Sequence, residues 1–134
     1  MSKWFWRVGL GLHLSFVLLI GFSAYAGYIP NVIHAIPKGD VLCHFLLIGM
    51  VGFFVDGVLG FRPLWPGRFE WLRLGPILVI CVAGAEELAQ AAVPHRSCNI
   101  WDFVGDVTGV FFFSWLATRL EQWKTLRSAD QGVS

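Results

Sequence analysis

Apolar residues along this chain form four long blocks separated by short polar segments. The blocks run from about Val8 to Tyr28, Val41 to Phe61, Leu72 to Val93 and Ile100 to Leu120. Each block has about 20 residues, the length that an α-helix needs to cross about 30 Å of hydrocarbon. Stretches such as Phe16-Val-Leu-Leu-Ile20 do not alternate between apolar and polar positions, as the strands of a membrane barrel would. The pattern therefore predicts four transmembrane helices.

The composition supports a membrane protein and argues against a soluble enzyme. Hydrophobic residues make up 56% of the 134 residues and charged residues 14%, against about 45–50% and about 25% in a soluble domain. The mean hydropathy is +0.64. A net charge of +1 provides no basic face, so nucleic acid is not an expected partner. We expect one all-α domain over residues 1–134, a polytopic bundle of four transmembrane helices.

The distribution of lysine and arginine predicts the orientation of this bundle. Eight of the ten basic residues lie in the N-terminal segment, the middle loop and the C-terminal tail, and the other two are Lys38 and Arg96. Because basic residues favour the cytoplasmic side, both termini are expected in the cytoplasm. Lys3 and Arg7 before the first apolar block also resemble the start of a signal peptide. We interpret that block as an uncleaved helix.

Ionisable side chains gather near the outer ends of three predicted helices. Glu87 lies seven residues before Pro94, and Asp106 lies seven residues after Asn99, which puts both about 10 Å below the outer surface. Asp102 and Asp106 are four residues apart and share a helix face. Charged groups at this depth are costly and indicate function. We predict an outward-facing polar pocket with ligand-binding residues Asp40, His44, Glu87, Gln90, Arg96, Asp102 and Asp106.

The residue types of this pocket favour several chemistries. His44 with Glu87 or Asp102 is a candidate for acid–base catalysis, and Arg96 suits a phosphate or carboxylate group. The carboxylates also suit a divalent cation, although the sequence requires no cofactor. Metalloprotease, serine-hydrolase and phosphate-loop signatures are all missing from the sequence, so enzymatic activity is left open. A structural alternative is that these groups only form hydrogen bonds between helices.

Other polar residues in the apolar blocks are assigned structural roles. Asp56 lies near the cytoplasmic end of its block and close to Arg62 in the sequence, which favours an interfacial position or a local ion pair. His13 stands alone among leucine and glycine residues. We interpret it as a hydrogen-bonded contact between helices.

Two further pairs of residues concern helix packing. Gly105 and Gly109 form a G-x-x-x-G pattern, which is typical of closely approaching membrane helices. Cys43 and Cys98 are both expected near the outer side. A disulfide between them is one alternative, although their spacing in the sequence does not fix their separation in space.

The polar residues also match a known family. The pattern Glu87-x-x-Gln90-x-x-x-Pro94-x-Arg96 followed by Asp102-x-x-x-Asp106-x-x-Gly109 resembles the C-terminal signature of VanZ-like membrane proteins. Asp40-x-x-x-His44-Phe45 resembles the motif of that family's second helix, and the resemblance covers about residues 38–115. The family usually has asparagine where this chain has Asp106, which adds a possible negative charge.

The resemblance implies four helices and a role in the bacterial cell envelope, since the family's namesake is associated with resistance to the glycopeptide teicoplanin. We therefore expect a protein of the bacterial cytoplasmic membrane that binds or modifies an anionic envelope lipid or a lipid-linked precursor, with an effect on glycopeptide susceptibility. The alternative is a non-catalytic accessory subunit or assembly factor of a larger membrane complex. A proton or ion pathway is the third hypothesis, with only His13 and Asp56 as candidates in the cytoplasmic halves.

Overall fold

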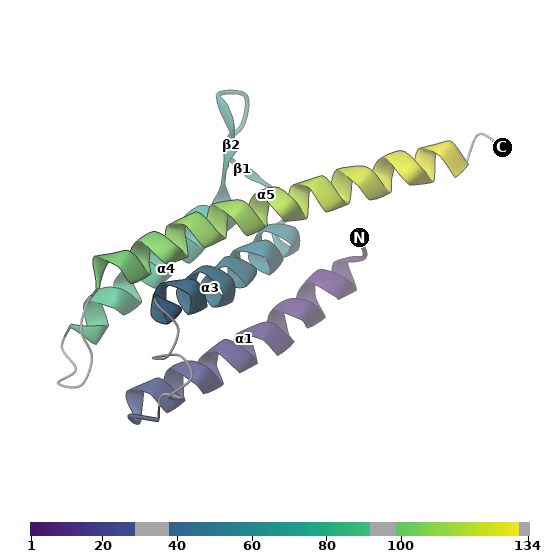
Figure 1. Cartoon of the computed structure of the whole chain (residues 1–134). Coiled ribbons are helices and arrows are strands. Elements are labelled where there is room, and N and C mark those ends of the chain that lie inside the picture. Colours follow the sequence, from purple (N-terminus) through teal and green to yellow (C-terminus); the bar gives the residue numbers. More distant parts are fainter. Residues whose placement is uncertain (29–37, 92–98, 132–134) are drawn as a thin grey trace.

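The described part of the chain forms four long helices and one small hairpin (Figure 1). The computed structural model describes residues 1–28, 38–91 and 99–131, with side chains as far as residue 128. In chain order its elements are α1 (Lys3–Tyr25), α3 (Gly39–Val58), β1 (Pro63–Trp65), β2 (Phe69–Arg73), α4 (Leu74–Gln90) and α5 (Ile100–Gln131). The Ser2 hydroxyl caps α1 by accepting a 3.1 Å hydrogen bond from the Phe5 amide. The four predicted helical segments are confirmed.

Three of these helices are long and apolar enough to cross a membrane, which fits a membrane protein. They are α1, α3 and the part of α5 that ends at Ser128. Helix α4 has 17 residues, so it is about 25 Å long, which is less than the hydrocarbon thickness. The predicted third span extends to Val93, and residues 92 and 93 lie outside the described part of the chain. The fourth crossing therefore stays a prediction.

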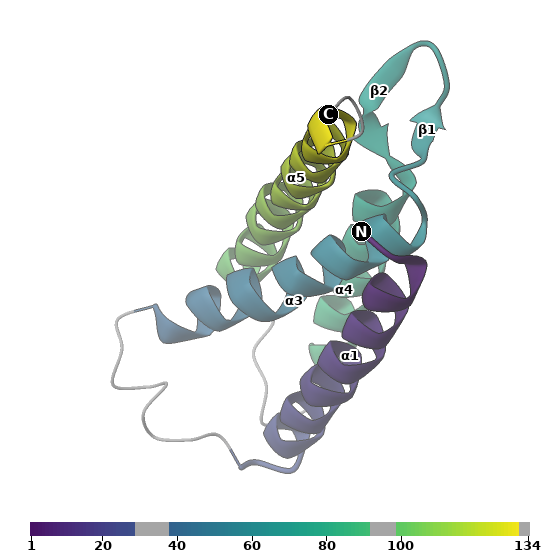
Figure 2. The same cartoon turned by 90° about the vertical axis from the view of Figure 1, so that its right-hand side faces the viewer.

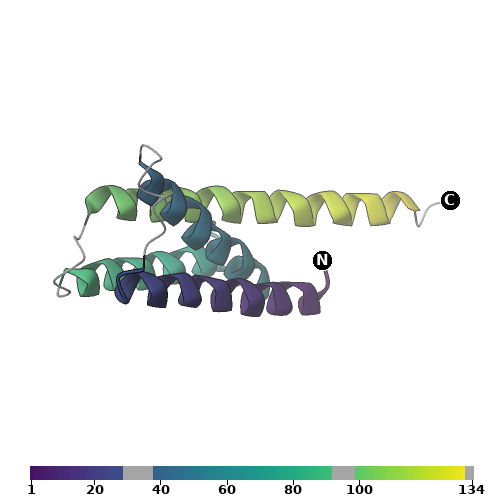
Figure 3. The same ribbon diagram turned by 60° about the horizontal axis from the view of Figure 1, so that its bottom comes forward.

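Helix α3 is the centre of the bundle and packs against α1, α4 and α5. Figure 2 shows α1 and α5 on different sides of it, and Figure 3 shows α3 running obliquely to α5. The N-terminus and the end of α5 lie at the same end of the bundle (Figure 1). This agrees with both termini on one side of a membrane, while the choice of the cytoplasmic side stays a prediction.

Glycines bring α3 and α5 together along their length. A Cβ atom added at Gly109 would lie 2.9 Å from the backbone C and Cα atoms of Phe45, and one at Gly49 would lie 3.0 Å from the Cα atom of Gly109. Only glycine permits an approach this close. The prediction from the G-x-x-x-G pattern is confirmed. The prediction for His13 is confirmed as well, because its Nε2 atom lies 2.9 Å from the Leu47 carbonyl oxygen.

The middle loop contains strands that the all-α prediction missed. Strands β1 and β2 pair antiparallel, with Trp65 opposite Phe69. Pro66 and Gly67 occupy the central positions of the turn, and Gly67 has a φ of +80°, as the third residue of a type II turn requires. The sequence did not predict these strands because β1 has only three residues, too few to show alternation.

The end of α5 also differs from the prediction. The helix continues to Gln131 rather than ending near Leu120. The prediction followed apolar residues only, whereas the continuation from Glu121 is polar and rich in helix-forming residues. With 32 residues, α5 is about 48 Å long. Its last turns must therefore extend beyond a hydrocarbon core of about 30 Å.

Candidate functional site

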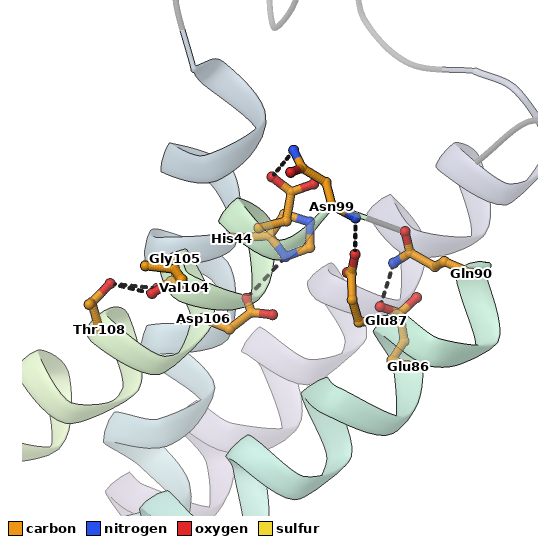
Figure 4. A network of polar contacts seen from close by, with 10 residues as sticks. His44, Glu86, Glu87, Gln90, Asn99, Val104, Gly105, Asp106 and Thr108 are labelled. Atoms are coloured by element: carbon orange, nitrogen blue, oxygen red, sulfur yellow. Dashed lines mark hydrogen bonds and ion pairs between the residues drawn. The ribbon is translucent and has the colours of Figure 1, made fainter. Parts of the chain in front are cut away.

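A histidine of α3 and an aspartate of α5 face each other at the contact between these two helices (Figure 4). The Nδ1 atom of His44 lies 3.0 Å from Oδ1 of Asp106. Asp106 is 2% exposed, and its neighbour Gly105 lets the backbone of α5 approach Val41 and His44. An ionised aspartate only accepts hydrogen bonds, so Nδ1–H donates. Among the residues that the structure describes, none is hydrogen-bonded to the Nε2 atom of His44, so this atom can face a substrate or ligand.

Glu87 brings a third helix, α4, into this site (Figure 4). Its Oε1 atom accepts a 2.6 Å hydrogen bond from the Asn99 backbone amide. Glu87 is 5% exposed, and its Oε2 atom has no hydrogen-bond partner among the described residues. A buried carboxylate oxygen without a partner is costly. Glu87 also lies close enough to His44 to act on it electrostatically.

Asn99 organises the start of α5 and was not among the predicted site residues. Its Oδ1 atom accepts a 3.2 Å hydrogen bond from the Trp101 amide, which is the geometry of a helix N-cap. Its side-chain amide donates to Oδ1 of Asp102 at 3.4 Å. Asn99 therefore links Asp102 to Glu87. An asparagine immediately before an apolar helical block was the available signal.

Glu86 connects the site to α1. It accepts a 2.9 Å hydrogen bond from the Tyr25 hydroxyl and another hydrogen bond from the side-chain amide of Gln90. Glu86 itself is exposed, whereas Gln90 is 4% exposed. The sequence alone did not predict the hydrogen bond between Tyr25 and Glu86.

The structure brings together most of the predicted ligand-binding residues. His44, Glu87, Asp102 and Asp106, which we call the polar cluster, come from α3, α4 and α5. Gln90 lies beside them. Asp40 is exposed in the first turn of α3, at the edge of the cluster.

Three other predictions on this site have no structural outcome. Arg96 lies outside the described residues, and so does Cys98, so the disulfide with Cys43 is likewise untested. In the described ranges, no three histidine, cysteine, aspartate or glutamate side chains gather closely enough to hold a metal ion. The divalent cation therefore stays a prediction.

A second buried polar group lies at the opposite end of α3 and corrects the prediction for Asp56. Asp56 is fully buried, and its Oδ2 atom lies 3.1 Å from Nε of Arg73, not beside Arg62. The guanidinium group of Arg73 also donates to the hydroxyl of Thr118 on α5. Asp56 is thus a core residue rather than an interfacial one. Its partner lies at the junction of β2 and α4.

Comparisons of this chain with protein-family models, curated proteins and solved structures gave no match. The resemblance to VanZ-like proteins therefore rests on the residues quoted above. The functional argument rests on the geometry of the polar cluster.

Proposed function

We propose that this protein is a VanZ-like membrane protein whose polar cluster binds or modifies the headgroup of an anionic envelope lipid or lipid-linked precursor. The observation that supports the proposal is the burial of Glu87 and Asp106 beside His44, within three helices that consist mainly of apolar residues in this region. Three separate helices contribute to this one place. Buried ionisable groups of this kind in a membrane protein usually face a binding site or a pathway.

The chemistry of the cluster suits a polar headgroup. In this proposal His44, oriented by Asp106, exchanges a proton with the ligand. The free Oε2 atom of Glu87 accepts a hydrogen bond from a headgroup hydroxyl or amine. Carboxylates repel a phosphate group, so the phosphate is assigned to Arg96, three residues before Asn99. Whether the headgroup is only bound or also modified is left to the experiment.

The proposal includes a location. We place the protein in the bacterial cytoplasmic membrane with four crossings, both termini in the cytoplasm and the polar cluster near the outer surface. The excess of lysine and arginine at the end opposite to the cluster supports this orientation. The aromatic residues Trp65 and Trp71 of the hairpin are exposed at that same end, which suits a membrane interface.

The test is native mass spectrometry of the protein extracted gently from its own membranes. We expect a 15.0 kDa chain carrying a lipid of defined mass. Replacing Glu87 with glutamine or His44 with alanine should lower the bound fraction roughly tenfold, since each removes a hydrogen bond to an ionisable group. Glu70→Gln, which changes an exposed glutamate of the hairpin, should leave the lipid in place.

Two outcomes would overturn the proposal. One is that the chain carries no lipid, or that Glu87→Gln and His44→Ala do not change the fraction of chain that carries lipid. The other is a reproducible mass that includes a second protein, with loss of that complex in the same variants. The polar cluster would then be an assembly contact, as expected for an accessory subunit.

A further inference from the structure

A small cavity lies between the first turns of α1 and the end of α3. It has a volume of about 160 Å³ and is lined by Lys3, Arg7, Gly57, Val58 and Gly60. Since a water molecule occupies about 30 Å³ of liquid, the space holds roughly five waters. That is room for one compact polar group rather than for an acyl chain.

The walls of this cavity are held in place by aromatic packing. Trp6 is 3% exposed, and its ring centroid lies 5.2 Å from that of Phe53. The indole ring of Trp6 covers Gly57 so closely that any side chain there would overlap it. The beginning of α1 is therefore fixed against α3. Lys3 and Arg7, on either side of Trp6, are positioned by the same contact.

The two basic residues are not neutralised by the protein. Lys3 and Arg7 are four residues apart on one face of α1, and both are exposed. Neither has an ion pair or a hydrogen bond in the described part of the chain. Two acids at this end of the bundle are already engaged, because Asp56 pairs with Arg73 and Glu121 binds the amino group of Met1.

The end of α3 does not need these cations as caps. The amide of Leu59 donates to the carbonyl of Val55, that of Gly60 to Gly57, and that of Phe61 to Asp56. These hydrogen bonds satisfy carbonyl groups that would otherwise attract a cation. The charged groups of Lys3 and Arg7 therefore remain available to a ligand in the cavity.

The cavity lies at the level of lipid headgroups when α1 crosses a bilayer. With 23 residues, α1 is about 35 Å long, so its first turn extends past a hydrocarbon core of about 30 Å. Trp4, in that turn, is 73% exposed, and tryptophan favours the membrane interface. The chemical group that is anionic, compact and abundant at this level is a phosphate.

We propose that Lys3 and Arg7 form a phosphate-binding site for the headgroup of an anionic phospholipid. This site is independent of the function proposed above, because Gly57 lies thirteen residues along α3 from His44, about 20 Å away. It would hold a lipid of the opposite leaflet. Free phosphate or a phosphorylated metabolite shares the same chemistry, and the experiment separates these sources.

The test uses the full chain, purified in detergent and stripped of lipid. Short-chain phosphatidylglycerol is titrated and followed by native mass spectrometry, with inorganic phosphate in a parallel titration. We expect saturable binding of phosphatidylglycerol, weakened roughly tenfold or more by the double change Lys3→Gln and Arg7→Gln. The matched control, Lys124→Gln with Arg127→Gln, removes the same number of positive charges from α5. It should bind phosphatidylglycerol as tightly as the unchanged chain does.

The outcomes distinguish a specific binding site at Lys3 and Arg7 from a general attraction of anionic lipid to positive charge. If both double variants lose affinity equally, or if neither probe saturates, the proposal is wrong. Displacement of the lipid by inorganic phosphate at low millimolar concentration would support the site and assign it to free phosphate. Thermal unfolding midpoints of both double variants check that each has folded. The variant Lys3→Arg with Arg7→Lys should keep the affinity.

Discussion

Replacing Arg73 with alanine should lower the free energy of unfolding by about 3–5 kcal/mol, because it leaves a buried carboxylate without its partner. Asp56 is fully buried, and the Nε atom of Arg73 lies 3.1 Å from its Oδ2 atom. Arg73 also donates to the hydroxyl of Thr118, so the change removes a connection among α3, α5 and the hairpin. Titration with a denaturing detergent in mixed micelles measures the difference.

Two further variants serve as the control for this prediction and as the test of its physical cause. Arg62→Ala changes the arginine that the sequence analysis placed beside Asp56, and it should alter the free energy by less than about 0.5 kcal/mol. The double change Asp56→Leu with Arg73→Met should cost much less than the two single changes together, because it removes both charges at once. Equal losses in Arg62→Ala and Arg73→Ala would show that the ion pair with Arg73 is not formed.

The ion-pair partner of Asp56 could not be predicted from the sequence. Proximity along the chain favoured Arg62, six residues away, since a helix end and its loop are usually neighbours. The hairpin instead reverses the direction of the chain and brings Arg73, at the start of α4, next to Asp56 of α3. This reversal depends on a strand of three residues, β1. A strand this short has no periodicity from which its presence could be predicted.

The polar cluster, in contrast, was predictable to a large extent. Helix periodicity put Asp102 and Asp106 on one face, and depth below the outer surface put Glu87 and Asp106 at the same level. These arguments need only regular helices of known direction. The link from Tyr25 to Glu86 was not predictable, because it depends on which helix lies beside the end of α1, and the sequence pattern of α1 does not specify that neighbour.

Replacing Gly109 with alanine should lower the free energy of unfolding by about 1–3 kcal/mol, the usual cost of overpacking. The added methyl group would meet backbone atoms of Phe45, which cannot turn aside as a flexible side chain can. Helices α3 and α5 must then move apart. Asp106 lies about one turn before Gly109, and His44 is next to Phe45 in the chain. We therefore also expect a weaker hydrogen bond between His44 and Asp106 and a smaller fraction of bound lipid.

The matched control for this change is Gly11→Ala on α1. A Cβ atom added there would have no neighbour within 4 Å, so the better helix propensity of alanine should leave the stability equal or up to about 1 kcal/mol higher. The two variants make the same chemical change in two apolar helices, and only the contact with α3 differs. A Gly109→Ala protein as stable as the Gly11→Ala protein would mean that α3 and α5 are not in backbone contact. The close approach that aligns His44 with Asp106 would then lack its physical basis.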